Sequence, residues 1–557
     1  MKAGAFRRTG LGVHLCLLTA LLVVIGLFVG PPGRYSADEG AVLIAAHSVA
    51  DGDGWLTPHP LPTVDRTGRE YPLVSSDWGE RGISAYAKHP AFVVVVAAGE
   101  WLAPGWGPMA VSVLGTALAA LLSALLARRI DPRTAVVTLW LVGLASPLFV
   151  DSFLVMAHTL AAATAVAAVL AADAARRSSR LMAVAWAMAT FLTVMVTAML
   201  RTEGLFIGLG LACAMVVVGP VRGRPRNLVV GAAAALGSVA AFLIDRRLLS
   251  AIVGAPVADE ARGVFVGAGG FVSTRVESLS LTLLHPSYRG GGGAFLLLLA
   301  MMLLAVGVYR YSRNPSEPQM PIGLLIAAGL VLIIRALALG PDGVPGLLVA
   351  FPLGWMGVVL AGRSLAADGA ARVALVTTAV FAAAVGATQY AVGGGVDWGG
   401  RYFALAIPLV APLAAGGLLA AAGRLAIPWR RPAAAGLALV VLGIALLGVR
   451  ELYESEGMAR RFYKGLGTVA APLGSKPVVV TSAILLPRLA GQSFGDHRWL
   501  LADPERPDRL VERLRRAGIE KFVLVTGNPI GDRSLTTGGT RVSSSVIEGW
   551  QVDVYRT

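Results

Sequence analysis

Residues 11–30 read LGVHLCLLTALLVVIGLFVG, and this uncharged stretch decides the fold class. A helix needs about 20 apolar residues to cross about 30 Å of hydrocarbon. Similar runs recur through the first four-fifths of the 557 residues. The chain is 56% hydrophobic and 15% charged, whereas a soluble protein carries about a quarter of charged residues. We therefore predict an α-helical polytopic membrane protein with about 13 transmembrane helices.

The flanks of this first run set the orientation of the chain. Lys2, Arg7 and Arg8 precede it, which predicts a cytoplasmic N-terminus. The run is longer than the core of a secretory signal and many more spans follow, so we interpret it as an uncleaved first helix. A net charge of +15 in such a chain is typical of cytoplasmic loops, and we expect no nucleic-acid partner.

One short apolar run decides the topology of everything after it. Residues 91–104 are too short to span the membrane and contain Glu100 beside Trp101, so we interpret them as an interfacial or re-entrant segment. All arginine-rich turns then fall on the cytoplasmic side, and counting the run as a span would move them outside. These turns are 128–133, 176–180, 222–226, 310–313, 363–372 and 424–431.

The sequence divides into two predicted domains. Residues 1–450 form a transmembrane domain with a long external loop, 31–106. Residues 451–557 are no longer membrane-like and predict a small α/β domain outside the cytoplasm. Its expected strands and helix are 476–482 (KPVVVTS), 521–527 (KFVLVTG), 550–555 (WQVDVY) and a helix over 503–516.

Two adjacent carboxylates, Asp38 and Glu39, follow the first span and precede an expected amphipathic helix over 41–50. Carboxylates near lipid tend to be functional when partly buried, and one could act as a general base with the other as a metal ligand or orienting partner. The alternative is a helix cap with favourable dipole charge, Asp38 at the cap and Glu39 behind it. Both interpretations stay open on these residues alone.

Further polar groups lie on the same expected face of the membrane. Asp151 precedes an apolar span and is either a helix cap or a second external acid. Lys88 and His89 end the first external loop, where they either hold a phosphate or lie at the membrane interface. Arg401 and Tyr402 precede another span, where they either hold a phosphate or sugar hydroxyl or lie at the membrane interface.

Arg201 and Glu203 interrupt a long apolar stretch. Charges at this depth are costly unless paired, so we expect these two side chains to pair with each other.

The order of these features resembles the GT-C superfamily of membrane glycosyltransferases, in particular the bacterial protein O-mannosyltransferase-like enzymes and the lipid A aminoarabinose transferase. The resemblance covers most of the membrane part. In chain order the features are a first span, Asp38-Glu39, Gly52-Asp53-Gly54-Trp55-Leu56-Thr57-Pro58, Lys88-His89-Pro90, Asp151 after a Ser-Pro turn, Arg201-Thr202-Glu203-Gly204 and Gly400-Arg401-Tyr402.

The resemblance implies an enzyme that takes a sugar from a polyprenyl-phosphate carrier and passes it to a lipid, glycan or protein acceptor outside the cytoplasm. It implies Asp38 as the catalytic base with Glu39 assisting, and Asp151 as a second external acid. A divalent cation (Mg²⁺, Mn²⁺ or Zn²⁺), with Asp151 and Glu39 as ligands, is left open. Lys88 and Arg401 would hold the carrier phosphate, aided by neighbouring His89 and Tyr402.

Two departures from the family pattern bear on these expectations. The family often has Lys-Pro-Pro where this chain has Lys88-His89-Pro90, so His89 adds a donor or a metal ligand. Residues 451–557 match no known catalytic module.

The main alternative is a multi-spanning lipid or solute transporter, which would place charges near the bilayer midplane in paired halves. Here the charges gather at helix ends and no halves repeat; a non-catalytic assembly or sensor protein is a third reading.

Overall fold

The computed structural model describes residues 10–557 apart from 32, 34, 58, 66–69, 72–77, 80–81, 84–88, 219–223, 254–269, 288–289, 341, 363–367, 391–397, 502–506 and 528–538. Its internal contacts divide the chain into two units. Unit 1 contains Met1–Val29, Met109–Asp245 and Glu260–Leu452, and unit 2 contains Gly30–Pro108, Arg246–Asp259 and Tyr453–Thr557.

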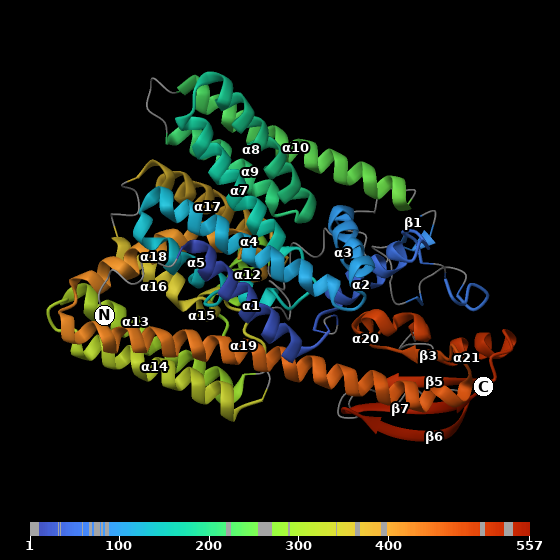
Figure 1. The fold of residues 1–557 in the computed structure, drawn as a ribbon. Coiled ribbons are helices and arrows are strands. Elements are labelled where there is room, and N and C mark those ends of the chain that lie inside the picture. The colour runs from blue at the N-terminus through green and yellow to red at the C-terminus, as the bar shows by residue number, and fades with distance from the viewer. Residues whose placement is uncertain are drawn as a thin grey trace. The chain divides into compact units, whose positions relative to one another are not determined.

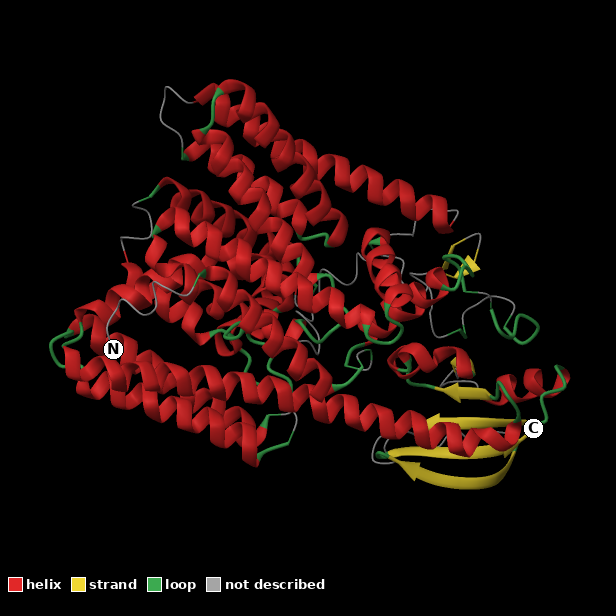
Figure 2. Cartoon of the chain, in the orientation of Figure 1, coloured by secondary structure: helices red, strands yellow, loops and turns green. Residues whose placement is uncertain are grey.

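The membrane-type helices confirm the polytopic helical fold class (Figures 1 and 2). Ten helices in the described part of the chain are long and apolar enough to span a membrane, and three apolar helices, 90–102, 204–217 and 352–361, are shorter. The helices that lie wholly or partly in unit 1 are α1 (Leu11–Val29), α4 (Gly107–Ile130), α5 (Ala135–Gly143), α6 (Leu148–Asp151), α7 (His158–Arg177), α8 (Arg180–Leu200), α9 (Gly204–Val217), α10 (Arg224–Val253), α12 (Gly270–Leu284), α13 (Gly291–Arg313), α14 (Gln319–Ala338), α15 (Leu347–Ala350), α16 (Pro352–Ala361), α17 (Gly369–Thr388), α18 (Ile407–Arg424) and α19 (Ile427–Ala470). Two short 3-10 turns, η2 (Pro132–Thr134) and η5 (Arg401–Ala406), belong to the same unit.

Small residues let the helices of unit 1 approach closely. A Cβ on Gly417 of α18 would overlap the backbone oxygen of Gly357 in α16, so only glycine allows this contact. Close packing of small residues is the usual way in which helices associate within lipid. The opposite faces are apolar and exposed; Leu17 and Val24 of α1 are 55% and 63% exposed. Such a surface is suited to hydrocarbon and not to water.

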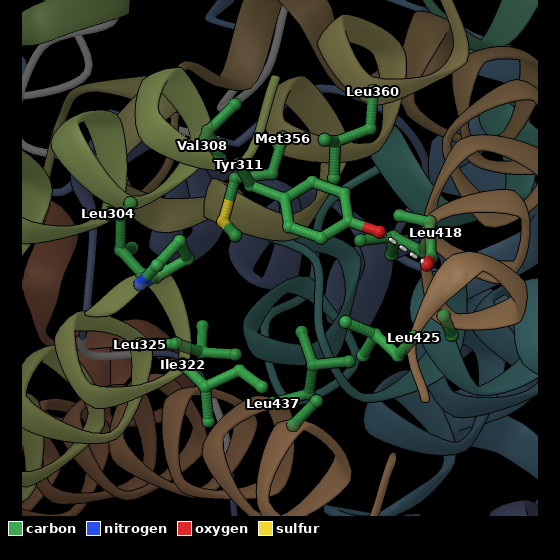
Figure 3. A pocket seen from close by; sticks show the side chains of 15 residues that line it. Leu304, Val308, Tyr311, Ile322, Leu325, Met356, Leu360, Leu418, Leu425 and Leu437 are labelled. Atoms are coloured by element: carbon green, nitrogen blue, oxygen red, sulfur yellow. Dashed lines mark hydrogen bonds between the residues drawn. The ribbon is translucent and has the colours of Figure 1, made fainter. Parts of the chain in front are cut away.

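An apolar cavity of about 90 Å³ lies within unit 1 among α13, α14, α16, α18 and α19 (Figure 3). Leu304, Ile322, Met356 and Leu437 are among the side chains that line it. The one polar tip that points across it, the Tyr311 hydroxyl, donates a hydrogen bond to the Ala421 carbonyl at 2.7 Å. The cavity therefore offers apolar contacts with no charged group in its lining.

Unit 2 contains a five-stranded sheet in the order β4-β3-β5-β7-β6 (Figure 1). β4, β3 and β5 are parallel, whereas β7 runs antiparallel to both β5 and β6. The three strands expected from sequence are present, and β4 and β6 were not predicted. The bounds are β3 (Val478–Thr481), α20 (Leu485–Leu489), η7 (Gly491–Asp496), β4 (Arg498–Leu501), α21 (Pro507–Arg516), β5 (Lys521–Thr526), β6 (Thr540–Ile547) and β7 (Trp550–Arg556).

The segment after the first span packs on this sheet. It contains α2 (Ala37–Ala50), β1 (Trp78–Gly79), β2 (Gly82–Ile83) and α3 (Pro90–Leu102). Leu61 and Val64 share one hydrophobic core with residues of β3, β4, β5 and α21. Glu70 pairs with Arg513 of α21, and its carbonyl accepts a hydrogen bond from the Leu501 N–H at 2.5 Å. This part of the loop is thus an integral component of the unit.

Helix α19 does not end where the sequence stops being membrane-like, near Glu451, but continues to Ala470. Its second half buries a stripe that contains Phe462 and Leu466. The Phe462 ring lies 6.0 Å from the ring of Trp550 in β7. The second half of the helix is stable because its apolar stripe packs against the sheet of unit 2.

His497 makes the stability of unit 2 dependent on pH. Burial lowers the pKa of this imidazole below its ordinary value of 6.5, against weaker opposing effects of Asp496 and of the Ser493 backbone. The unfolded chain therefore takes up a proton first as the pH falls. We expect the midpoint of thermal unfolding to fall from about pH 7 downwards, and His497→Gln to flatten that profile. A wild-type profile no steeper than that of the variant between pH 7 and 5 would contradict this assignment.

Candidate functional site

The first carboxylates lie at the N-terminus of α2 in unit 2. Ser36, and not Asp38, is the N-cap, and its hydroxyl accepts a hydrogen bond from the Glu39 N–H at 3.2 Å. The fully buried Glu39 carboxylate accepts a hydrogen bond from the Tyr35 N–H at 3.2 Å. This is close to a capping box, so Glu39 has a structural task. Asp38, in the first turn and only partly buried, lies where the helix dipole favours a negative group.

The second motif, which contains His89, begins α3. His89 is buried and precedes Pro90 with φ of 49°, in the left-handed region that non-glycine residues rarely adopt. Lys88 lies outside the described residues. Near the other end of α3, the buried Glu100 carboxylate accepts hydrogen bonds from the Gly105 N–H at 3.1–3.2 Å. Since α2 packs along α3, His89 and Asp38 belong to one pair of helices.

Unit 1 contains a buried Asp–His pair. Asp151 is the last residue of the short helix α6, and His158 is the first residue of α7, so a turn separates the two residues. The Asp151 Oδ2 lies 3.4 Å from the His158 Nδ1, and both side chains are almost fully buried. Neither ring nitrogen of His158 has a hydrogen-bond partner among the described residues. The pair is therefore available for a proton or a further polar group.

Arg401 and Tyr402 begin η5, which packs on α7. The Arg401 guanidinium lies 5.1 Å from the Tyr402 ring centroid and donates to the Tyr402 hydroxyl at 3.4 Å. A Cβ on Gly399, whose φ is 64°, would come within 2.5 Å of Pro147, which precedes α6. The close approach of these two turns brings Arg401 and Asp151 onto adjoining segments of unit 1.

The expected pairing of Arg201 with Glu203 is confirmed. The Arg201 Nε and Nη2 lie 3.0 and 2.6 Å from the two Glu203 carboxylate oxygens. Both residues act electrostatically on Tyr402. Arg201, Glu203 and Arg401 thus carry the charges that act on Tyr402.

The described residues contain no group of three or more His, Cys, Asp or Glu side chains placed to hold a metal ion. Asp151 and His158 supply two donors of a type that Zn²⁺ accepts. The Glu39 carboxylate instead accepts a hydrogen bond from the Tyr35 N–H beside the start of α2. Within each unit, the described residues do not complete a metal site.

Sequence reasoning missed two features of unit 2 that have recognisable signals. The spacing of Ser36 and Glu39 is that of a capping box, which would have identified Ser36 as the N-cap. Arg460, Lys464 and Gly467 lie at i, i+4 and i+7 of α19 and line one cavity. A helix extending past Glu451 would have placed them on one face.

Comparison with known proteins identifies the fold. No family model matches the chain, and no curated protein matches it. Among solved structures, it is similar to ArnT from Cupriavidus metallidurans bound to undecaprenyl phosphate, at 14% identity and a TM-score of 0.54, with 98% of each chain covered. The apo state of the same protein matches equally well, with 97% of each chain covered.

A second group of similar structures is the oligosaccharyltransferase AglB from Archaeoglobus fulgidus. Its complex with Zn and sulfate is 12% identical with a TM-score of 0.50, covering 92% of this chain and 68% of that one. A further complex of AglB contains an inhibitory peptide and a dolichol-phosphate, at 11% identity and a TM-score of 0.50. Both proteins are GT-C membrane glycosyltransferases, so the resemblance predicted from the motifs is confirmed at the level of the fold.

Proposed function

We propose that this chain, a multi-pass membrane protein with the GT-C fold, transfers a sugar from a polyprenyl-phosphate donor to an acceptor on the extracytoplasmic face of the membrane. The observation that carries the proposal is the fold match over 98% of both chains to a protein bound to undecaprenyl phosphate. The arginine-rich turns support the orientation, because such turns stay in the cytoplasm.

Asp38 is the proposed general base. Its carboxylate takes the proton of an acceptor hydroxyl while that oxygen attacks the anomeric carbon of the donor sugar. The bond from the anomeric carbon to the phosphate oxygen breaks, and its electron pair leaves with the polyprenyl phosphate. One displacement of this kind inverts the configuration at the anomeric carbon.

The leaving phosphate needs positive charge nearby. Arg401, with Tyr402 beside it, and Lys88, with His89 beside it, are the proposed phosphate ligands. Asp151 is proposed as the second acid, acting with His158 on the acceptor or donor hydroxyls. Glu39 supports Asp38 by fixing the first turn of α2.

The test is transfer of label from a radioactive polyprenyl-phosphate sugar pool in membranes with and without this protein. We expect a labelled product only when the protein is present, with the opposite anomeric configuration to the donor. If a folded protein transfers no label from any of several donor sugars, the glycosyltransferase assignment fails and lipid transport becomes the better explanation.

A further inference from the structure

Unit 2 contains a large polar cavity that the proposed chemistry does not use. It has a volume of about 880 Å³ and lies among the second half of α19, the residues before β3, and η7 with the residue that follows it, His497. All of its lining residues belong to unit 2. This volume is in the range of small-molecule sites, about 300–1,000 Å³.

One wall of the cavity is cationic. Arg460, Lys464 and Gly467 follow one another along a single face of α19, since positions i, i+4 and i+7 share a face. The Arg460 guanidinium lies against Gly30, where an added Cβ would come within 2.6 Å of it. A Cβ on Gly467 would meet no atom within 4 Å, so the space beside these cations is open.

Another part of the lining contains the buried imidazole of His497. His497 is 8% exposed, and its Nδ1 has no hydrogen-bond partner among the described residues. Its ring lies 5.4 Å from the Trp499 ring, which fixes its orientation. A buried imidazole nitrogen without a partner loses free energy unless a ligand bonds to it. Asp496 and Ser493 stand beside it and supply oxygen atoms that can bond to hydroxyl groups.

We infer that this cavity binds an acidic sugar, a phosphorylated or carboxylate-bearing hexose unit. The two cations of α19 match the acidic group. Asp496, Ser493 and His497 match the sugar hydroxyls, which both donate and accept hydrogen bonds. The single carboxylate of Asp496 leaves the lining with a net positive charge.

One of the segments that line the cavity packs against the helix that carries Asp38. η7, which contributes Ser493 and Asp496, packs against α2. A Cβ on Gly491 at the start of η7 would come within 3.0 Å of the Gly33 carbonyl oxygen. Within unit 2, a sugar in the cavity is therefore next to the segment that leads to Asp38. Resting here on the proposed function, we assign this sugar to the acceptor.

Binding to the purified full-length protein in detergent, measured by calorimetry without any donor, tests the inference. The probes are glucose 6-phosphate, glucuronate, glucose and inorganic phosphate. We expect one of the two acidic sugars to bind, with glucose and phosphate at least about tenfold weaker, because each satisfies only half of the site.

Two variants alter the cavity by different means. Lys464→Gln removes a charge, and Gly467→Leu adds a side chain at a position where the Cβ meets no atom within 4 Å. Each is expected to weaken binding of the acidic sugar about tenfold. Lys521→Gln is the matched control, since it removes one charge from an exposed position of β5 outside the cavity. Thermal unfolding without probe checks that all variants fold.

Equal binding by wild type, Lys464→Gln and Gly467→Leu would overturn the inference, as would no binding of either acidic sugar. If inorganic phosphate bound as tightly as glucose 6-phosphate, the cavity would be a site for anions only, and the inference would also be overturned. Binding with the expected pattern in a protein that transfers no label would instead contradict the proposed function alone.

Discussion

Asp38→Asn should lower sugar transfer by about a hundredfold to ten-thousandfold while leaving expression unchanged. The amide keeps the size of the side chain and can still form hydrogen bonds at the helix N-terminus, but it accepts no proton from the acceptor hydroxyl. Asp38 is partly exposed in the first turn of α2, and it is Ser36 that caps the helix. The helix should therefore keep its start in the variant. Label transfer in membranes, normalised to protein amount, measures the effect.

Asp51→Asn is the matched control for that experiment. Asp51 is the C-cap of the same helix, its side chain is 54% exposed, and its carboxylate lies 3.2 Å from the His47 ring nitrogen Nε2. Exposed pairs of this kind contribute about 0–1 kcal/mol. Transfer within twofold of wild type is expected for this control. If Asp38→Asn behaved in the same way as Asp51→Asn, Asp38 would not be the base.

Gly40→Ala should disrupt the packing of unit 2 and abolish transfer together with it. A Cβ at this position of α2 would overlap the backbone carbonyl oxygen of Arg488 in α20. Because the obstacle is backbone and not a flexible side chain, one helix must move. Overpacking of this kind costs about 1–3 kcal/mol and occasionally more. The midpoint of thermal unfolding of the purified protein should fall, and α2 should lose the position that holds Asp38.

Gly416→Ala controls for the substitution itself. Gly416 lies in α18, and an added Cβ there meets no atom within 4 Å. In a helix, alanine is more stable than glycine by about 0.5–1 kcal/mol. This variant should unfold at the same or a higher temperature than wild type. A stable and active Gly40→Ala protein would show that α2 and α20 are not packed as closely as described.

Local patterns predicted much of the fold because they depend on near neighbours in the sequence. The apolar run at residues 11–30 could only be a span, and α1 occupies Leu11–Val29. The apolar strands 476–482 and 521–527 contain β3 and β5, whose side chains are mostly buried. β6 was missed because most of its side chains are exposed and four of its eight residues are Thr or Ser. β4 was missed because it has only four residues.

The candidate site residues were also visible in the sequence, but their partners were not. The sequence indicated that Arg201 and Glu203, two residues apart, would pair, and they do. It indicated that Asp151 precedes an apolar span, whereas the partner of Asp151, His158, lies across a turn and was not indicated. The contacts of Gly399 with Pro147 join segments about 250 residues apart, which no local pattern can indicate.

The sequence by itself determined that this chain has many membrane-spanning helices. It also determined where the polar turns between them lie and that a small α/β region follows. These properties arise from hydrophobicity, period and charge, which act along the chain. Only the tertiary structure decided that Leu61 and Val64 pack on the C-terminal sheet, that Glu39 bonds to the Tyr35 N–H, and that α19 and η7 line one cavity. Burial and hydrogen bonding between distant segments depend on three-dimensional packing, so one residue's neighbours in space cannot be read from its neighbours in the chain.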